Sequence, residues 1–140
     1  MALPSVGGGY QVGDGNLNEL DIYATAAQQT ATVTATLTVA QITGNLLVGN
    51  PSTSAATYTL PTAAAIDAVM TNAKVGSTFN LIVVNIGTSS GIITIAVGTG
   101  ITAVGNLLVA ITGSAAGVGG AAQFMFRKTG TAAYDLFRIA

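Results

Sequence analysis

The stretch FNLIVVNIGTSSGIITIAVGTG, residues 79–100, contains no charged side chain and is apolar at both sets of alternate positions. Alternating and β-branched residues are typical of strands, and the Gly and Ser residues at its centre are typical of a turn. The stretch therefore predicts a β-hairpin with two apolar faces. One set of side chains is expected to face the core of the same chain: Ile82, Val84 and Ile86. The other set is expected to face a further apolar surface, either a helix or a neighbouring subunit: Phe79, Leu81 and Val83.

Strand patterns continue on both sides of this stretch. The run TATVTATLTVA, residues 30–40, alternates Thr with Ala, Val and Leu. This strict period of two makes it the clearest strand prediction in the chain. Gly, Pro, Asn or Ser clusters separate most of the further candidates. They are residues 45–48, 57–60, 78–86, 92–97, 107–112, 121–128 and 133–139.

One helix is expected among these strands, at residues 62–73. Thr62 is a favourable N-cap residue, and Ile66, Val69 and Met70 follow it at helical spacing. Several short strands with a single helix predict an all-β fold of the β-sandwich or jelly-roll type.

A short sequence repeat occurs within this pattern. The pentapeptide GNLLV stands at residues 44–48 and again at residues 105–109. It marks either two related halves of the domain or a coincidence of biased composition. The lack of longer self-similarity around the two copies favours coincidence.

The first twenty residues differ in composition from the rest of the chain. The segment VGGGYQVGDGNLNE, residues 6–19, is rich in Gly and Asn and shows no sustained periodicity. We therefore expect residues 1–20 to form an extended N-terminal arm and residues 21–140 to form the β-sandwich domain. An arm of this composition is expected to become ordered only on contact with a partner.

The chain carries very few charges. It has four Lys and Arg and five Asp and Glu, so that 6% of its residues are charged, against about 25% in an ordinary soluble domain. Weak electrostatic repulsion between copies favours association. Together with the doubly apolar stretch, this predicts a stable homo-oligomer, with a trimer as the expected state, because obligate interfaces resemble a core cut in half.

The composition argues against several classes of function. His and Cys are absent, so a catalytic triad lacks its imidazole, and neither an enzyme nor a cofactor is expected. Four scattered cations do not form the basic face that nucleic acid requires. The uncharged runs are interrupted every few positions by polar residues, so a membrane span is not expected either.

The best metal candidate lies in the N-terminal segment. Asp14, Asn16 and Asn18 occupy the first, third and fifth places of a calcium loop, but Glu19 replaces the Gly of place six and Thr25 the Glu of place twelve. An Asx-rich turn explains the same residues, because Asn and Asp bond to their own backbone. We favour the turn and expect no metal site.

The C-terminal segment concentrates aromatic and basic residues, and it predicts a hairpin with Thr129 and Gly130 at its tip. Phe124 and Phe126 share one face of this hairpin, and Phe137 and Ile139 are expected to pack. Its charged residues either lie solvated at the rim or belong to an interface. The candidate interface residues of the whole chain are Tyr10, Phe79, Leu81, Val83, Arg127, Lys128 and Arg138.

A resemblance follows from residues 57–140. The run YTLPTAAAIDAVMTNAKVGSTFNLIVVNIGTSSGIITIAVGTGIT and the ending AAQFMFRKTGTAAYDLFRIA resemble the β-structured virion proteins of tailed bacteriophages. These are the capsid decoration (cement) proteins and head or tail fibre modules of marine and cyanobacterial phages. The resemblance implies a β-sandwich or jelly-roll protomer, a homotrimer and attachment to the major capsid protein, and it brings no catalytic residues.

Two functions are consistent with this resemblance. The first is a cement protein on the capsid exterior, made in the host cytoplasm, which stabilises the head by bridging major capsid protein subunits. The second is a fibre, spike or adhesin module that binds a host glycan or receptor. Glycan sites commonly expose aromatic residues, whereas the aromatics of this chain fall in predicted strands, and this favours the cement protein.

Overall fold

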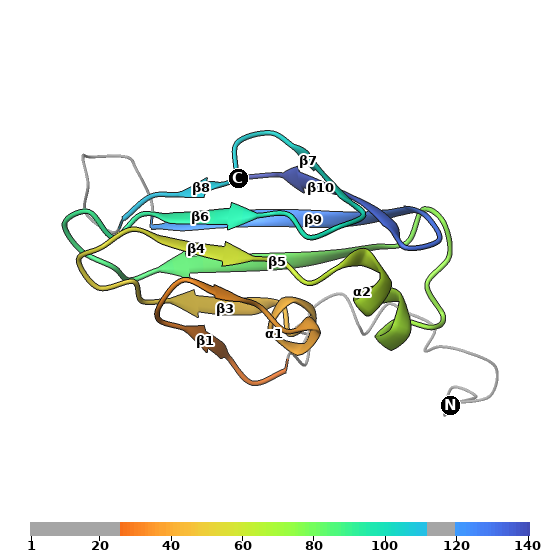
Figure 1. Cartoon of the computed structure of the whole chain (residues 1–140), viewed down its shortest axis with the longest axis horizontal. Helices are drawn as coiled ribbons and strands as arrows, with labels where there is room; N and C mark the ends of the chain where they lie inside the picture. The colour runs from red at the N-terminus through yellow and green to blue at the C-terminus, as the bar shows by residue number, and fades with distance from the viewer. Residues whose placement is uncertain (1–25, 112–119) are drawn as a thin grey trace, which may run out of the picture.

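The computed structural model describes residues 26–111 and 120–140. Within these ranges the chain forms ten strands and two short helices (Figure 1). The β-rich class is as predicted, whereas the short helix at Val39–Thr43 was not expected. The predicted arm, Tyr10 and the calcium candidates from Asp14 to Glu19 lie outside the described residues, as does residue 112 at the end of one predicted strand.

The larger sheet has six strands in the order β1-β3-β5-β9-β10-β7. Strands β1, β3 and β5 are parallel neighbours, β9 is antiparallel to β5 and β10, and β7 is parallel to β10. The bounds are β1 (Gln29–Ala31), β3 (Leu46–Gly49), β5 (Thr78–Asn85), β7 (Ile101–Val104), β9 (Ala121–Gly130) and β10 (Ala133–Arg138).

The smaller sheet has four strands in the order β2-β4-β6-β8. Its first three strands are parallel and β8 is antiparallel to β6. The bounds are β2 (Ala35–Thr36), β4 (Ala56–Thr59), β6 (Ile93–Ala96) and β8 (Leu108–Val109). A jelly roll is built from antiparallel strands, so the parallel pairs in both sheets differ from that expectation.

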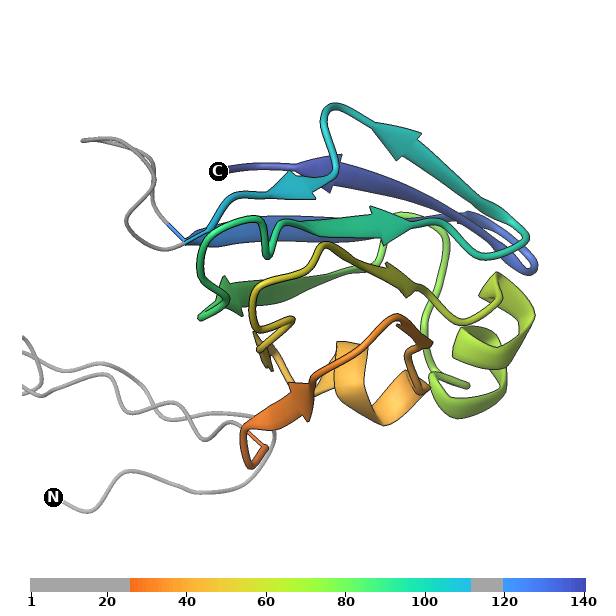
Figure 2. The ribbon, with the colours of Figure 1, turned by 60° about the vertical axis from the view of Figure 1, so that its left-hand side comes forward.

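Successive strands alternate between the two sheets from β1 to β9. Each pair β1–β2, β3–β4 and β5–β6 therefore makes one coil. The coils stack, so that β1, β3 and β5 are parallel neighbours in the larger sheet and β2, β4 and β6 are parallel neighbours in the smaller sheet. Figure 2 shows the resulting layers, with the helices α1 (Val39–Thr43) and α2 (Ala63–Val69) next to each other at one side.

The connections of the stacked coils bond to one another at the end of the sandwich opposite α2 (Figure 1). The Asn50 N–H donates to the Ala31 carbonyl (2.8 Å), and the Thr88 N–H donates to the Ser52 carbonyl (2.7 Å). A Cβ on Gly91 would stand 2.5 Å from the Ser52 carbonyl oxygen. Only Gly permits this close approach between two backbones, so Gly91 fixes the spacing of the coils.

The core lies between the two sheets. Its members from the smaller sheet include Tyr58, Ile93 and Ile95, and those from the larger sheet include Leu81 and Phe124, all buried. Tyr58 also donates its hydroxyl to the Ala31 carbonyl of β1 (2.8 Å), which ties the sheets together with a hydrogen bond. Burial raises the pKa of this phenol.

The prediction of one strand at residues 30–40 was wrong. The run divides into β1, β2 and the start of α1, and Val33, between the strands, is 68% exposed. Thr38 ends the extended segment because it caps α1. Its hydroxyl accepts the Gln41 N–H (3.2 Å), while the Gln41 side chain accepts the Thr38 N–H (2.8 Å). This reciprocal capping box fixes a helix start that overrides the alternation.

The predicted helix at residues 62–73 is confirmed, but it is shorter. Thr62 caps α2 by accepting the Ala65 N–H (3.2 Å), and Ile66 is buried as expected. The helix ends at Val69, which is exposed, and Met70 is its C-cap residue. Val69 therefore does not share the buried face of the helix with Ile66.

The predicted hairpin at residues 79–100 was also wrong. Both of its strands exist, but β5 belongs to the larger sheet and β6 to the smaller one, so that the turn between them crosses the sandwich. The two GNLLV copies likewise enter different sheets, through β3 and β8. They do not occupy equivalent positions, in agreement with coincidence.

The remaining strand predictions agree with the structure to within two residues for β3, β4, β5, β6, β9 and β10. Strand β7 was missed, and the strand predicted at residues 107–112 is reduced to β8 in the described part. The C-terminal hairpin is confirmed, with its turn at residues 131–132 and not at Thr129 and Gly130. Its buried residues on β10 are Tyr134 and Leu136, whereas Ile139 is 54% exposed.

Candidate interaction surface

The larger sheet presents an apolar outer face, on the side opposite the core. Four of its members are exposed large hydrophobic residues: Ile82 (40%), Ile86 (49%), Val104 (43%) and Ile139 (54%). Such patches on soluble proteins mark interaction sites. We name as the apolar face the outward hydrophobic residues of β3, β5, β7, β9, β10 and their direct continuations: Leu46, Val48, Ile82, Val84, Ile86, Val104, Met125, Phe137 and Ile139.

Strand register places these residues in rows across the sheet. Leu46, Ile82 and Gln123 lie opposite one another on β3, β5 and β9. Met125 and Phe137 lie opposite each other on β9 and β10. Cross-strand neighbours on one face are close enough to contact, so the rows form a continuous surface.

One row at an end of this face is charged. Arg127 of β9 lies opposite Asp135 of β10, and the row continues to Thr78 on β5 and Thr102 on β7. Arg127 is exposed and Asp135 is half-buried. Although they are cross-strand neighbours, no ion pair joins them. Among the described residues, the ion pair is that of Lys128 with Asp67.

The outer face of the smaller sheet has a different character. Its outward positions on β2, β4 and β6 carry mainly hydroxyl groups. They are Thr36, Thr57, Thr59, Thr94 and Ala96. Beside them, Leu108 of β8 lies opposite Thr94 and is 44% exposed, and Ile92, just before β6, is 40% exposed. The smaller sheet therefore mixes Thr hydroxyls with a few exposed hydrophobic side chains, whereas large hydrophobic residues occupy outward positions on five strands of the larger sheet.

The assignment of the two faces of β5 was wrong. Leu81 (1% exposed) and Val83 point into the sandwich, and Phe79 lies on the same side, partly buried against the core. The Phe79 ring stacks on that of Phe126 with centroids 4.5 Å apart. These three residues thus pack within their own chain, and Ile82, Val84 and Ile86 face outward instead.

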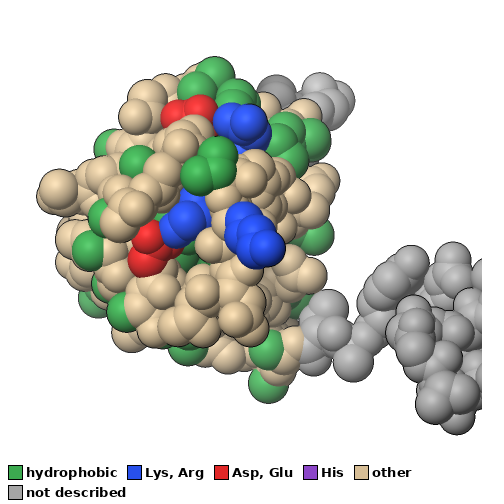
Figure 3. Space-filling view, turned by 90° about the vertical axis from the view of Figure 1, so that its right-hand side faces the viewer, with side chains coloured by type: hydrophobic (Ala, Val, Ile, Leu, Met, Phe, Trp, Pro, Cys, Tyr) green, Lys and Arg blue, Asp and Glu red, His purple; other side chains and the backbone are tan. Residues whose placement is uncertain are grey.

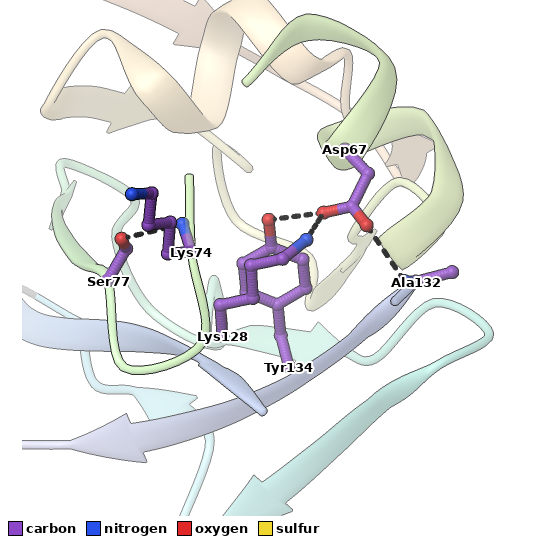
Figure 4. A network of polar contacts seen from close by, with 6 residues as sticks. All are labelled: Asp67, Lys74, Ser77, Lys128, Ala132 and Tyr134. Carbon is purple, nitrogen blue, oxygen red and sulfur yellow. Dashed lines mark hydrogen bonds and ion pairs between the residues drawn. The ribbon is translucent and has the colours of Figure 1, made fainter. Parts of the chain in front are cut away.

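Lys128 is neither solvated nor part of an outer face. It is 8% exposed and forms an ion pair and hydrogen bond with Asp67 of α2. The Asp67 carboxylate also accepts the Tyr134 hydroxyl (2.7 Å) and the Ala132 N–H (2.8 Å), as Figure 4 shows. The Lys128 ammonium lies 5.2 Å from the centre of the Tyr134 ring. Three donors from the β9–β10 hairpin therefore converge on one carboxylate of α2.

Electrostatics in this cluster follow from the hydrogen bonds. The donors Lys128, Tyr134 and the Ala132 N–H lower the pKa of Asp67 from 3.8 to about 2. Burial, and then the neighbouring Asp67 carboxylate, raise the pKa of Tyr134. At neutral pH the carboxylate is charged and the phenol is protonated, which is the state in which every donor has its acceptor. The cluster consequently joins α2 to the hairpin.

The other predicted interface residues have separate positions. Arg138, at the end of β10, donates to the Asn106 carbonyl (3.4 Å), the Leu108 carbonyl and the Ala140 carbonyl (3.2 Å). It therefore links the larger sheet to β8 of the smaller one. Figure 3 views the α2 end of the molecule, where basic side chains lie beside acidic ones in a largely uncharged surface.

No group of three or more His, Cys, Asp or Glu side chains in residues 26–111 and 120–140 could hold a metal ion. Within the same ranges, none of the helices is long and apolar enough to cross a membrane.

The apolar face was missed for an identifiable reason. Both phases of β5 contain an Asn, Asn85 with Leu81 and Val83 and Asn80 with Ile82, so polarity does not tell which phase is buried. Asn85 is fully buried, and its side chain bonds to the Gly91, Val109 and Ala110 carbonyls and to the Gly87 N–H. The carbonyls at residues 109 and 110 are distant in sequence, so the sequence alone does not reveal that the phase of Asn85 is the inner one.

No family model matches this chain, and no curated protein or solved structure matches it either.

Proposed function

We propose that this protein is a structural virion protein, a capsid decoration (cement) protein that stabilises a phage head by bridging neighbouring major capsid protein subunits. The observation that carries the proposal is the weakly charged surface of the chain, with 6% charged residues and with exposed large hydrophobic side chains on both sheets, among them Ile92 and Leu108 at the smaller sheet. The resemblance of residues 57–140 to phage virion proteins supports a role on the phage particle.

The energetics of a lattice support such a role. Burying apolar area contributes about 25 cal/mol per Å², and a capsid repeats each small contact many times. Multivalent attachment then gains avidity without any single strong site. A weakly charged, apolar surface is suited to this kind of binding.

The proposal includes the assembly and its place. The protein forms a homotrimer, is made in the host cytoplasm and binds the capsid exterior, where residues 1–20 act as an arm that contacts the major capsid protein. It acts without a cofactor and is not an enzyme. The relationship to jelly-roll proteins is proposed at the level of a two-sheet architecture only, because the pairing of the strands is mixed.

The test is the thermal stability of phage heads with and without this protein. Heads that carry it should release DNA at a higher temperature than heads that lack it. Since apolar contacts are screened little by salt, the difference should persist at high ionic strength. Equal release temperatures would contradict the cement role.

Copy number separates the cement role from the fibre or adhesin role. A cement protein should be comparable in amount to the major capsid protein on a stained gel of purified particles. A fibre or adhesin module should be present in few copies. A scarce band together with unchanged head stability would favour the fibre.

A further inference from the structure

The outer face of the larger sheet leaves several large hydrophobic side chains exposed. Ile82, Ile86 and Ile139 remain between 40% and 54% exposed. The outward positions of β2, β4 and β6 in the smaller sheet are mainly Thr, and its exposed hydrophobic residues include Ile92 and Leu108. No described element covers the side chains of Ile82, Ile86 and Ile139. Large exposed apolar residues in one continuous sheet face indicate a surface that is buried in an assembly.

The charged row at the end of this face is balanced within itself. Arg127 and Asp135 carry opposite charges, stand on adjacent strands at the same level, and make no ion pair with each other. Lys128 is already paired with Asp67, and Arg138 bonds to three carbonyls of its own chain. Arg127 and Asp135 are therefore the charges that this face offers to a neighbour.

We propose that the apolar face binds second copies of the same chain in a cyclic assembly whose axis runs along the strands of the larger sheet. Rotation about such an axis leaves each residue at its own level. Every row therefore meets the same row of the next copy, so that Arg127 of one copy reaches Asp135 of its neighbour. The row of Met125 and Phe137, which also contains Asn80, meets its own copy, as does the row of Ile82 and Gln123. The inference deepens the proposed function and rests on its homo-oligomer part.

Charge complementarity favours a second copy over a foreign surface. In a second copy, Arg127 and Asp135 stand at the same level as Asp135 and Arg127 of the first copy, so that each charge can meet the opposite charge. A foreign partner such as the major capsid protein would need a separately matched pair beside an apolar surface. Like charges brought opposite each other suppress wrong pairings, so the row also fixes the register of the assembly.

The experiment uses the full-length purified protein and measures subunit dissociation by sedimentation at several concentrations. Arg127→Asp and Asp135→Arg should each raise the dissociation constant about tenfold or more, because each places like charges opposite each other. The double variant carrying both substitutions should restore the value to within a few-fold of the unchanged protein. Because Arg127 and Asp135 also lie opposite each other within one chain, each single reversal places like charges on adjacent strands. Thermal unfolding of each single variant therefore checks that the fold is intact, and dissociation of variants that stay folded assigns the two charges to the interface.

A matched pair of lysine substitutions tests the face as a whole. Ile82→Lys introduces a charge on an interior strand of the larger sheet and should give monomers. Thr94→Lys introduces the same charge on an interior strand of the smaller sheet and should leave the oligomer intact. Circular dichroism checks that each variant is folded, and the charge-swap series decides the matter if Ile82→Lys does not fold.

Several results would overturn the inference. A monomeric unchanged protein at micromolar concentration would refute both this interface and the proposed homo-oligomer. It would leave the capsid as the occupant of the face. An oligomer that persists in Ile82→Lys and in both charge reversals would refute the interface alone. Dissociation by Thr94→Lys to the same extent would also refute it. None of these outcomes alters the separate test of head stability.

Discussion

The protonation state of Asp67 affects the stability of the folded protein. Its pKa in the folded protein, about 2, lies below its ordinary value of 3.8 because Lys128, Tyr134 and the Ala132 N–H donate to the charged form. A lowered folded-state pKa contributes stability that is fully present above the ordinary value. That stability is lost as the pH falls toward the folded-state value.

We therefore expect Asp67→Asn to be less stable than the unchanged protein at pH 7. The difference in melting temperature should shrink between about pH 4 and pH 2, where the native carboxylate becomes protonated. Tyr134→Phe removes one of the three donors and should show an intermediate pH dependence. If Asp67→Asn loses stability with acid as steeply as the unchanged protein, another group is responsible.

Asn85 holds the end of β5 to the smaller sheet. Its amide donates to the Gly91, Val109 and Ala110 carbonyls, and its oxygen accepts the Gly87 N–H. Asn85→Ala should lower the free energy of unfolding by about 3 kcal/mol, since each buried polar group that loses its partner costs on the order of 1–3 kcal/mol. Chemical denaturation measures the loss.

The matched control is Asn72→Ala, an exposed position in the turn that follows α2. It should change the free energy of unfolding by less than about 0.5 kcal/mol, as surface substitutions usually do. Similar losses in the two variants would mean that the hydrogen bonds of Asn85 contribute little.

At the scale of elements, the start of α1 depends on Thr38. Thr38→Ala should cost about 1 kcal/mol of stability through loss of the N-cap. Thr38→Val should cost at least as much, although Val is the better strand residue, because it too lacks the capping oxygen. Thr36→Ala, in the same Thr-rich run but on β2, is the control and should have a small effect. A stabilising effect of Thr38→Val would indicate that the segment is extended.

This helix shows which part of the fold the sequence could reveal. The alternation in residues 30–40 indicates extended backbone locally, and the capping signature of Thr38 and Gln41 was present but was outweighed by it. Nothing in the alternation tells which sheet a strand joins, because the pattern is the same for a hairpin and for a turn that crosses between sheets. Most strand positions were therefore predictable, whereas the pairing of strands was predictable only for the C-terminal hairpin.

The candidate surface was predictable to a similar extent. Low charge and two apolar phases on β5 correctly indicated that one phase would face outward. The buried phase is that of Asn85, whose partners Val109 and Ala110 become its neighbours only in the folded chain. Lys128 was misplaced for the same reason, since its partner Asp67 lies 61 residues away in sequence.

At the scale of the whole molecule, the stacking of coils has a consequence for the order in which backbone amides become accessible to solvent exchange. The outermost coil consists of β1 and β2, which have three and two residues and a single strand neighbour each. Strands β5 and β9 are the longest and lie in the middle of the larger sheet. Local opening is easiest where few buried contacts resist it. Hydrogen exchange in the native protein should therefore proceed from the first coil inward, with amides of β5 and β9 protected longest, and equal protection of β1 and β9 would show that the sandwich opens only as a single unit.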